Sequence, residues 1–406
     1  MKAEKKVRFI DWSLFVFLLL AVSVVTLRLF HRQAAANPGA YPSDMKAYIL
    51  EMQGLDSGYS FPYPVYFKLS ALINLFTTPE MAVAVAAMLL NGLAIWITKL
   101  SFNYLALPKM KKGWLSGAIL SVLCVSLFFI SMLYPPDGIY LPGIRFWYLG
   151  VFSPNPFHNA TYIAARPFAI LAFLWYVKLL PVYEEGLHGD RGKLRDYILF
   201  SLFLLLATMT KPSFTIVLVG AAGLLMLFRM FRSRFRFFLP TIQLGLCFIP
   251  TFVDLLYQYK GVFVPDEGAE GGIGFSFGEV WGYYCTNLPL AICLAVGFPL
   301  LVLVLNYKEL KGDTFYRFSW QFYLMSFIMN FLLFEKGFRK PDFNFSWGYM
   351  YGIFFCHMGA LLVLIRSMSE KKKKPLLIGA QWLVYFWHAL CGLNYFLGIY
   401  RGGMYY

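Results

Sequence analysis

Apolar runs of about 20 residues recur along the whole chain, and they limit its possible folds more than any other feature. A helix of that length crosses the roughly 30 Å hydrocarbon layer of a membrane. Hydrophobic residues make up 59% of the sequence and charged residues 14%, which is more apolar surface than a soluble domain buries. A membrane β-barrel would instead show short segments of alternating polarity. The sequence therefore predicts an all-α, polytopic membrane protein, with residues 1–406 forming a single integral-membrane domain.

We expect about 11 transmembrane helices. The first run, Ile10 to Leu29, resembles a signal peptide, but it is long and no convincing cleavage site follows, so we expect it to be retained. At "MTKPSF" (209–214) proline ends or kinks a helix, and either a tight external hairpin or one broken helix fits. The predicted spans are residues 10–31, 80–101, 114–134, 161–182, 197–210, 213–230, 237–258, 285–306, 317–335, 347–366 and 375–397.

Lys and Arg concentrate in alternate loops, such as "LPKMKKG", "RMFRSRFR" and "RSMSEKKKKP", whereas the other loops are longer and hold most acids. Basic loops stay in the cytoplasm, so the N-terminus is expected inside and the C-terminus outside, in a bacterial plasma membrane. The same loops explain the net charge of +15 without a nucleic-acid partner. The six cysteines form no CxxC pair and indicate neither disulfides nor zinc.

The first external loop contains "YPSDMKAYILEMQG" (41–54), whose apolar residues Met45, Tyr48, Ile49 and Met52 have helical spacing. This predicts a short amphipathic helix led by Asp44. After "SFPYP" comes a second short apolar helix within "YPVYFKLSALINLF", and then a full span. Both short helices are expected to lie at the membrane interface.

This order resembles the N-terminal module of the GT-C superfamily of integral-membrane glycosyltransferases, here residues 1–101, with the remaining spans in 102–406. Asp44 occupies the place of the acid that starts the first interfacial helix in that superfamily. "SPNPFHNATYIAARPFAI" also resembles membrane proteins encoded among bacterial surface-polysaccharide genes. The resemblance implies sugar transfer from a polyprenyl-phosphate donor to a hydroxyl of a glycan or lipid-linked acceptor, with membrane lipids as further partners. No metal ligands are predicted, and a requirement for a divalent metal stays open.

Asp44 would be the general base that takes the acceptor's proton, in an inverting reaction. Its structural alternative is capping of the helix that follows, a role that Ser43 also fits. Glu51 lies two turns further on; it is a second candidate for substrate binding, and its alternative is a solvated helix face.

Cations are needed for the leaving lipid phosphate. Lys211 and Arg166 lie near predicted external helix ends, and Arg339 and Lys340 stand in "GFRKPDF". The alternatives are snorkelling to lipid headgroups for the first two and an ordinary solvated loop for the others.

His158 would contact a sugar, or alternatively make a structural hydrogen bond. The tripeptide that starts at Asn159 matches an N-glycosylation sequon, a match that is frequent by chance.

Two other functions compete with the transferase. A polysaccharide polymerase or ligase would use a lipid-linked oligosaccharide and rely on external Arg and His. A transporter or flippase would show charges in the middle of the membrane and repeat symmetry. Apart from Asp254, near the outer end of its span, the sequence offers little for the transporter.

Overall fold

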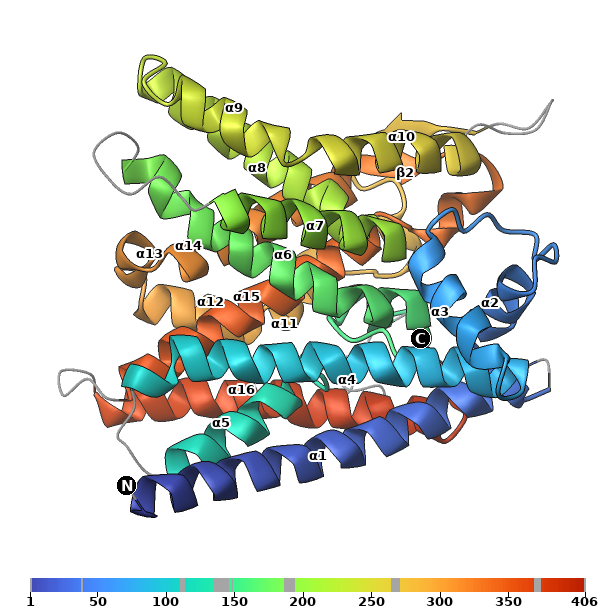
Figure 1. Ribbon diagram of the computed structural model, residues 1–406, viewed down its shortest axis with the longest axis horizontal. Helices are drawn as coiled ribbons and strands as arrows, with labels where there is room; N and C mark the ends of the chain where they lie inside the picture. Colours follow the sequence, from blue (N-terminus) through green and yellow to red (C-terminus); the bar gives the residue numbers. More distant parts are fainter. Residues whose placement is uncertain are drawn as a thin grey trace.

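The computed structural model describes residues 2–37, 39–109, 114–134, 146–147, 149–185, 194–263, 271–368 and 374–404. In these ranges the protein is an all-α bundle with one small two-stranded sheet (Figure 1). The all-α prediction is therefore confirmed for the described chain.

Six helices are long and apolar enough to cross a membrane, and two bent pairs each pass the same test as one span. The described residues therefore contain six to eight candidate spans. The six single helices are α1 (Lys2–Ala35), α4 (Pro79–Leu105), α6 (Ala160–Glu185), α8 (Ser213–Arg232), α15 (Ser346–Ser367) and α16 (Pro375–Tyr400). The two pairs are α9 (Phe238–Leu246) with α10 (Ile249–Phe263), bent by 51°, and α11 (Leu288–Ala295) with α12 (Gly297–Leu305), bent by 70°.

The expected count of about 11 spans is not confirmed, although every predicted segment coincides with a helix or a bent pair. Two of the remaining helices are short: α5 (Trp114–Ser126) has 13 residues and α7 (Leu194–Thr210) has 17. At 1.5 Å per residue, α5 is about 20 Å long, less than the hydrocarbon layer. The third, α14 (Thr314–Leu332), is less apolar, because its sequence includes Arg, Gln and two Ser.

The short elements gather mainly at one end of the bundle. Figure 1 shows α2 (Met45–Met52) and α3 (Pro64–Asn74) at the end where α1 stops and α4 starts, as the sequence predicts. We call this the loop end. The sheet joins β1 (Ile273–Phe275) antiparallel to β2 (Leu333–Glu335), with Ile273 opposite Glu335. The other short elements are η1 (Leu107–Lys109), η2 (Leu149–Phe152), η3 (Trp281–Tyr283), α13 (Glu309–Gly312) and η4 (Gly337–Asp342).

The chain turns back on itself at "MTKPSF", between α7 and α8. The hydroxyls of Thr208 and Thr215 lie 2.8 Å apart across this turn. Seven residues along one continuous helix would separate them by about 10 Å. Of the two alternatives, the structure has the hairpin, and Lys211 and Pro212 form its tip.

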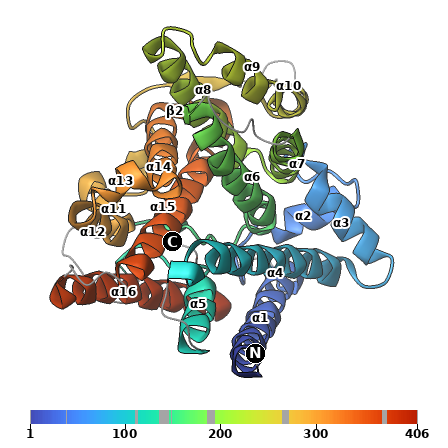
Figure 2. The ribbon, with the colours of Figure 1, turned by 60° about the vertical axis from the view of Figure 1, so that its left-hand side comes forward.

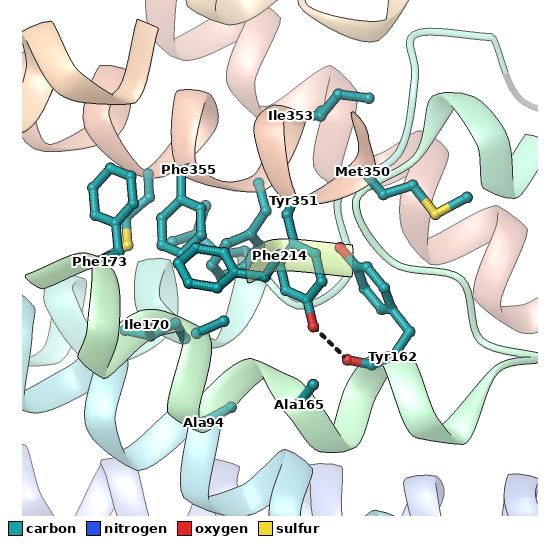
Figure 3. Packing of buried hydrophobic residues seen from close by; sticks show 14 of the residues in the cluster. Ala94, Tyr162, Ala165, Ile170, Phe173, Phe214, Met350, Tyr351, Ile353 and Phe355 are labelled. Atoms are coloured by element: carbon teal, nitrogen blue, oxygen red, sulfur yellow. Dashed lines mark hydrogen bonds between the residues drawn. The ribbon is translucent and has the colours of Figure 1, made fainter. Parts of the chain in front are cut away.

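The centre of the bundle is α15, whose candidate span is buried along its whole length. It packs against α8, α12, α14 and α16 (Figure 2). Aromatic rings fill the contacts on one side: Phe173 of α6 stacks on Phe355, with ring centroids 4.0 Å apart. Figure 3 shows this layer, where the Tyr351 hydroxyl also donates a 2.9 Å hydrogen bond to the carbonyl of Tyr162.

A buried ion pair ties the first helices together. Lys99 of α4 lies 2.7 Å from Asp11 of α1, and the Ser121 hydroxyl of α5 donates to the same carboxylate oxygen at 2.8 Å. Gly117 allows α5 to approach, because a Cβ at this position would lie 2.6 Å from the Asp11 carboxyl carbon. The sequence analysis did not single out this pair.

Candidate functional site

Asp44 precedes α2 but makes no side-chain capping hydrogen bond to it. Ser43 has that role instead, since its hydroxyl accepts from the Met45 amide at 3.4 Å. The Asp44 carboxylate points to partners elsewhere in the chain. Its Oδ2 accepts a 2.5 Å hydrogen bond from the Asn159 side chain and a 3.1 Å hydrogen bond from the Tyr48 hydroxyl. Among the described residues, no donor reaches Oδ1 of Asp44.

Asn159 stands at the start of α6, 115 residues away in sequence. Its side-chain oxygen accepts from the backbone amide of Tyr162 at 2.9 Å, which is the contact of a helix cap. The backbone beside it also holds Asp44, whose amide lies 3.4 Å from the carbonyl oxygen of His158. The loop before α6 thus fixes both the backbone and the carboxylate of Asp44.

Lys211, at the tip of the α7–α8 hairpin, reaches the same group of residues. Its ammonium lies 3.2 Å from the Thr161 hydroxyl and 3.4 Å from Oδ1 of Asn159. It also lies over the ring of Trp347, 4.7 Å from the centroid. The side chain is 6% exposed, so it is held in place rather than extended to a lipid headgroup.

Burial shifts the pKa values of these groups in opposite directions. It raises the pKa of the Asp44 carboxyl above its ordinary value, against the effects of Lys211 and of hydrogen bonds from Tyr48 and Asn159. It lowers the pKa of Lys211 to about 8, with nearby Arg339 adding to the effect and Asp44 opposing it. Acid and base thus both titrate closer to neutrality than usual.

A cavity of about 390 Å³ lies beside Lys211. Its walls come from α8, α10, the end of α14, β2, η4 and the start of α15, and they are mostly apolar. Polar groups stand at Lys211, Glu335 and Arg339, while Tyr63 and Trp347 add aromatic surface. The main apolar lining residues are Ile216, Val217, Leu255, Met329 and Leu333. Asp44 is not a lining residue; it is linked to Lys211 through Asn159.

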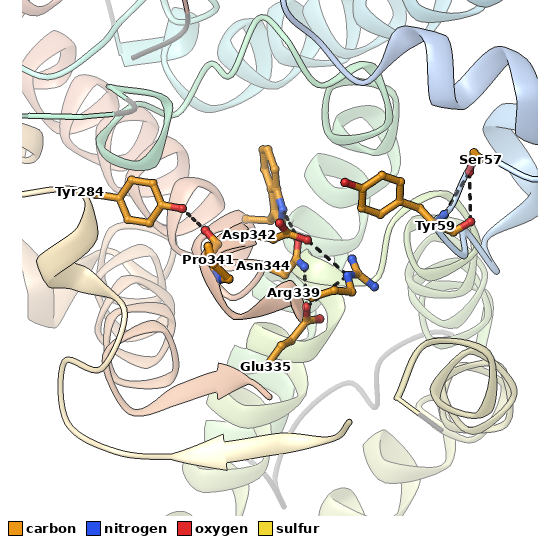
Figure 4. A network of polar contacts seen from close by, with 9 residues as sticks. Ser57, Tyr59, Tyr284, Glu335, Arg339, Pro341, Asp342 and Asn344 are labelled. Carbon is orange, nitrogen blue, oxygen red and sulfur yellow. Dashed lines mark hydrogen bonds and ion pairs between the residues drawn. The ribbon is translucent and has the colours of Figure 1, made fainter. Parts of the chain in front are cut away.

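Glu335 and Arg339 belong to a polar network at the cavity (Figure 4). Arg339 Nε lies 3.5 Å from a Glu335 carboxylate oxygen and 3.4 Å from Asp342. Asn344 donates to Glu335 at 2.7 Å and accepts from the Trp347 indole at 3.0 Å. Burial raises the pKa of Glu335 above its ordinary value. The network fixes one cation and one carboxylate at the cavity wall.

Several predicted site residues lie away from the cavity. Arg166 is 1% exposed among the rings of Phe128, Tyr162 and Phe354, and it donates to the carbonyl of Pro154 at 3.1 Å. Arg166 is enclosed among rings within the bundle. It therefore lies away from the other predicted cations and does not extend to lipid headgroups.

His158, Lys340 and Glu51 are not cavity residues either. His158 is buried, and burial lowers its pKa to about 3, so it is neutral near pH 7. Lys340 pairs with Glu279 on the surface. Glu51 is partly buried on α2 and does not line the cavity.

Four residues of this group were not predicted from the sequence as site residues, namely Asn159, Thr161, Glu335 and Trp347. Asn159 carried one usable signal, because Asn directly before an apolar helix is a good N-cap. Asn159 is also 2% exposed, which does not suit a glycosylation site. The other three had no signal, since only long-range packing brings them to Asp44 and Lys211.

No group of three or more metal-binding side chains is found in the described ranges. Comparison with models of known protein families, with curated proteins and with solved structures finds no significant match. The case for a function therefore depends on the geometry of the site.

Proposed function

We propose that this protein is a membrane glycosyltransferase that moves a sugar from a polyprenyl-phosphate donor to a hydroxyl acceptor during assembly of a surface glycan. One observation carries the proposal: a carboxylate whose Oδ1 receives no hydrogen bond from the described residues is held close to a buried lysine, and that lysine lines a cavity with mostly apolar walls. The cavity has two cations and one carboxylate at mostly apolar walls, and this excess of positive charge suits an amphiphilic anion such as a lipid phosphate.

The reaction needs one base and one anion site. The acceptor oxygen bonds to the anomeric carbon while that carbon's bond to the phosphate oxygen breaks. The acceptor proton passes to Oδ1 of Asp44, and the electron pair leaves with the lipid phosphate. Lys211 and Arg339 balance the charge that develops on that phosphate. A single displacement of this kind inverts the anomeric centre.

The structure favours this function over its competitors. A polymerase or ligase would rely on external Arg and His rather than on a carboxylate in the first loop. Arg339 does line the cavity, but Arg166 and His158 are buried and do not line it, and Asp44 lies beside Lys211. A transporter requires charges that a substrate meets in mid-membrane, and the buried pair of Asp11 and Lys99 is fully occupied by its own partners. We therefore rank both behind the transferase.

The proposed setting is a bacterial plasma membrane with the loop end outside, the N-terminus in the cytoplasm and the C-terminus outside. The charge asymmetry of the loops supports this orientation. Single cysteines placed in "SEKKKK" and in "PDEGAEGG" are expected to react with an impermeant maleimide from opposite sides. Labelling of both from one side would contradict the orientation.

The direct test uses the purified full-length protein in nanodiscs. A panel of polyprenyl-phosphate sugars is incubated with extracts of surface glycan as acceptors, and release of the lipid phosphate is measured. We expect turnover of at least one donor, lowered by roughly 10²- to 10⁴-fold in Asp44→Asn. Consumption of a lipid-pyrophosphate oligosaccharide alone would favour the polymerase. Movement of the donor across proteoliposomes without release of phosphate would favour the transporter.

A further inference from the structure

We propose that Asn159 is a positioning residue whose side-chain amide keeps the Asp44 carboxylate and the Lys211 ammonium apart at a fixed spacing. The inference rests on the proposed function and deepens it, because it assigns the group that prevents the base and the cation from neutralising each other. It stands on the hydrogen bonds of one buried amide, which is 2% exposed.

The orientation of this amide follows from its neighbours. Its oxygen faces three donors, which are the Tyr162 backbone amide, the Thr161 hydroxyl and the Lys211 ammonium, at 2.9, 3.0 and 3.4 Å. Its nitrogen faces the Asp44 carboxylate, an acceptor, at 2.5 Å. The flipped amide would set oxygen against carboxylate and nitrogen against the ammonium, so only one orientation satisfies the network.

A second bridge runs parallel to the first. The Lys211 ammonium reaches the Thr161 hydroxyl at 3.2 Å, Thr161 lies 3.0 Å from the Tyr48 hydroxyl, and Tyr48 donates to Asp44 at 3.1 Å. Thr161 has a single hydroxyl proton, so this bridge forms when Thr161 donates to Tyr48 in place of Asn159. Both bridges end on Oδ2 of Asp44. Lys211 and Asp44 are therefore linked twice without touching, and Oδ1 keeps its lone pairs for an incoming hydroxyl proton.

The spacing matters because, in a direct ion pair, neither Asp44 nor Lys211 would be available to a substrate. Where Asp11 and Lys99 meet at 2.7 Å, each has the other as its partner, and neither is left for a substrate. At the candidate site, the Asn159 amide replaces the direct contact: its nitrogen donates to the Asp44 carboxylate and its oxygen accepts from the Lys211 ammonium. Asn is suited to this role because it presents both, whereas Asp presents only acceptors.

Four titratable side chains from neighbouring elements face Asp44. They are Tyr48 of α2, Tyr63 before α3, Lys211 before α8 and Asp342 of η4. Burial keeps the pKa values of both tyrosines above their ordinary value, so they stay neutral. Asn159, Lys211 and Asp342 are therefore the neighbours through which a substitution can change the titration of Asp44, and Asn159 is the one whose replacement keeps the other two charges in place.

The decisive variant is Asn159→Asp. Asp caps a helix about as well as Asn, so a purely structural role predicts near-normal properties. A positioning role predicts the opposite, because the new carboxylate would repel Asp44 and attract Lys211. Two carboxylates at this distance cannot both ionise easily, and the labelling midpoint of the pair should rise by about one to two pH units or more.

The measurement needs no substrate. Dicyclohexylcarbodiimide reacts with protonated carboxyl groups in apolar surroundings, and mass spectrometry of the labelled protein follows Asp44 across pH. Asn159→Ser, which keeps a cap but loses the donor to Asp44, should also raise the midpoint, by about one to two pH units. Asn159→Ser therefore tests the positioning role even if Asn159→Asp does not fold. Asn287→Asp is the matched control, since Asn287 caps α11 away from the site.

The outcomes separate this inference from the proposed function. An unchanged midpoint in a folded Asn159→Asp or Asn159→Ser protein overturns the positioning role, whatever the enzyme does. A raised midpoint in both, with no change in Asn287→Asp, supports it. If the midpoint rises but the wild type turns over no sugar donor, the proposed function fails while the positioning role holds.

Discussion

Two lysine–aspartate combinations of this molecule are built in opposite ways: in one both residues are buried, and in the other the lysine is buried and the aspartate is partly buried. Lys99 and Asp11 are in direct contact at 2.7 Å, and a serine hydroxyl completes the carboxylate's partners. Lys211 and Asp44 are held apart by an amide and a pair of hydroxyls. The first arrangement joins three helices and leaves little for another molecule to bind. The second leaves one carboxylate oxygen without a donor among the described residues and places the lysine at a cavity.

The direct Asp11–Lys99 pair should matter for stability, whereas the separated Asp44 and Lys211 should matter for turnover. A buried charge that loses its partner destabilises a protein strongly, while a buried pair contributes little net stability over apolar residues. Removing one charge of the Asp11–Lys99 pair should therefore affect folding. Removing one charge at the site should affect turnover, because those groups keep polar partners on their bridges. The predictions below test this division.

The largest effect is expected for Asp44→Asn, which is nearly isosteric but cannot accept the acceptor's proton. Turnover should fall by roughly 10²- to 10⁴-fold, the usual contribution of a general base. Expression, melting temperature and donor binding should change little, and transfer assays in nanodiscs measure the loss. A fully active Asp44→Asn protein would remove Asp44 from the reaction.

Lys99→Met should instead destabilise the protein by about 3–5 kcal/mol, because Asp11 would be left buried and unpaired. Denaturant unfolding in detergent measures this. The double variant Asp11→Asn with Lys99→Met should recover most of the loss, and the folded fraction should keep its specific activity.

Lys178→Met is the matched control for that measurement. Lys178 pairs with Asp196 at 2.9 Å; the Lys178 side chain is 53% exposed and the Asp196 side chain is 7% exposed. Because solvent reaches this pair from the lysine side, the loss of Lys178 should destabilise the protein less than the loss of Lys99. Equal losses from Lys99→Met and Lys178→Met would contradict the structural role assigned to the buried pair.

Lys211→Met should weaken donor binding by roughly 10- to 150-fold, the value of one charge-assisted contact of about 1.5–3 kcal/mol. The apolar cavity and the Trp347 ring accommodate methionine, so the protein should still fold. Binding of a non-reactive polyprenyl phosphate in nanodiscs measures the change. Unchanged affinity in the folded variant would exclude Lys211 from the anion site.

The smallest predicted effect is a shift in the pH profile. Turnover requires Asp44 without its proton and Lys211 with its proton. Burial raises the pKa of Asp44 above its ordinary value, so activity should fall on the acid side at a higher pH than for a free carboxyl. Burial lowers the pKa of Lys211 to about 8, so activity should also fall above that pH. Lys211→Arg stays charged and should lose the alkaline limb; a limb that remains at the same pH belongs to another group.

Much of the helical layout could be predicted from the sequence, because runs of apolar residues report local structure. Every predicted span coincides with a helix or a bent pair, and the two short helices of the first loop stand where their patterns place them. The number of spans could not be predicted in the same way. Hydropathy does not reveal that α5 stops after 13 residues or that the chain bends by 70° between α11 and α12.

The site could be predicted only in part. Asp44 and Lys211 stand out because they are charges at helix ends in an apolar sequence, and the structure brings them together. Arg166 stands out for the same reason but is enclosed among aromatic rings. Asn159 and Glu335 are ordinary polar residues in sequence. Their importance comes from contacts such as the 115-residue separation between Asn159 and Asp44, which no local pattern encodes.

The buried course of α15 has a consequence for biogenesis. This helix, Ser346–Ser367, follows α1 to α14 in the chain, yet it occupies the centre of the bundle. Helices inserted earlier can pair with one another, but α8, α12 and α14 reach their final contacts only when α15 enters between them. Assembly in the membrane therefore finishes late, from the inside. A chain that ends before residue 346 lacks this central helix. We expect such a chain to expose unpaired helix surfaces and to be degraded by membrane quality control.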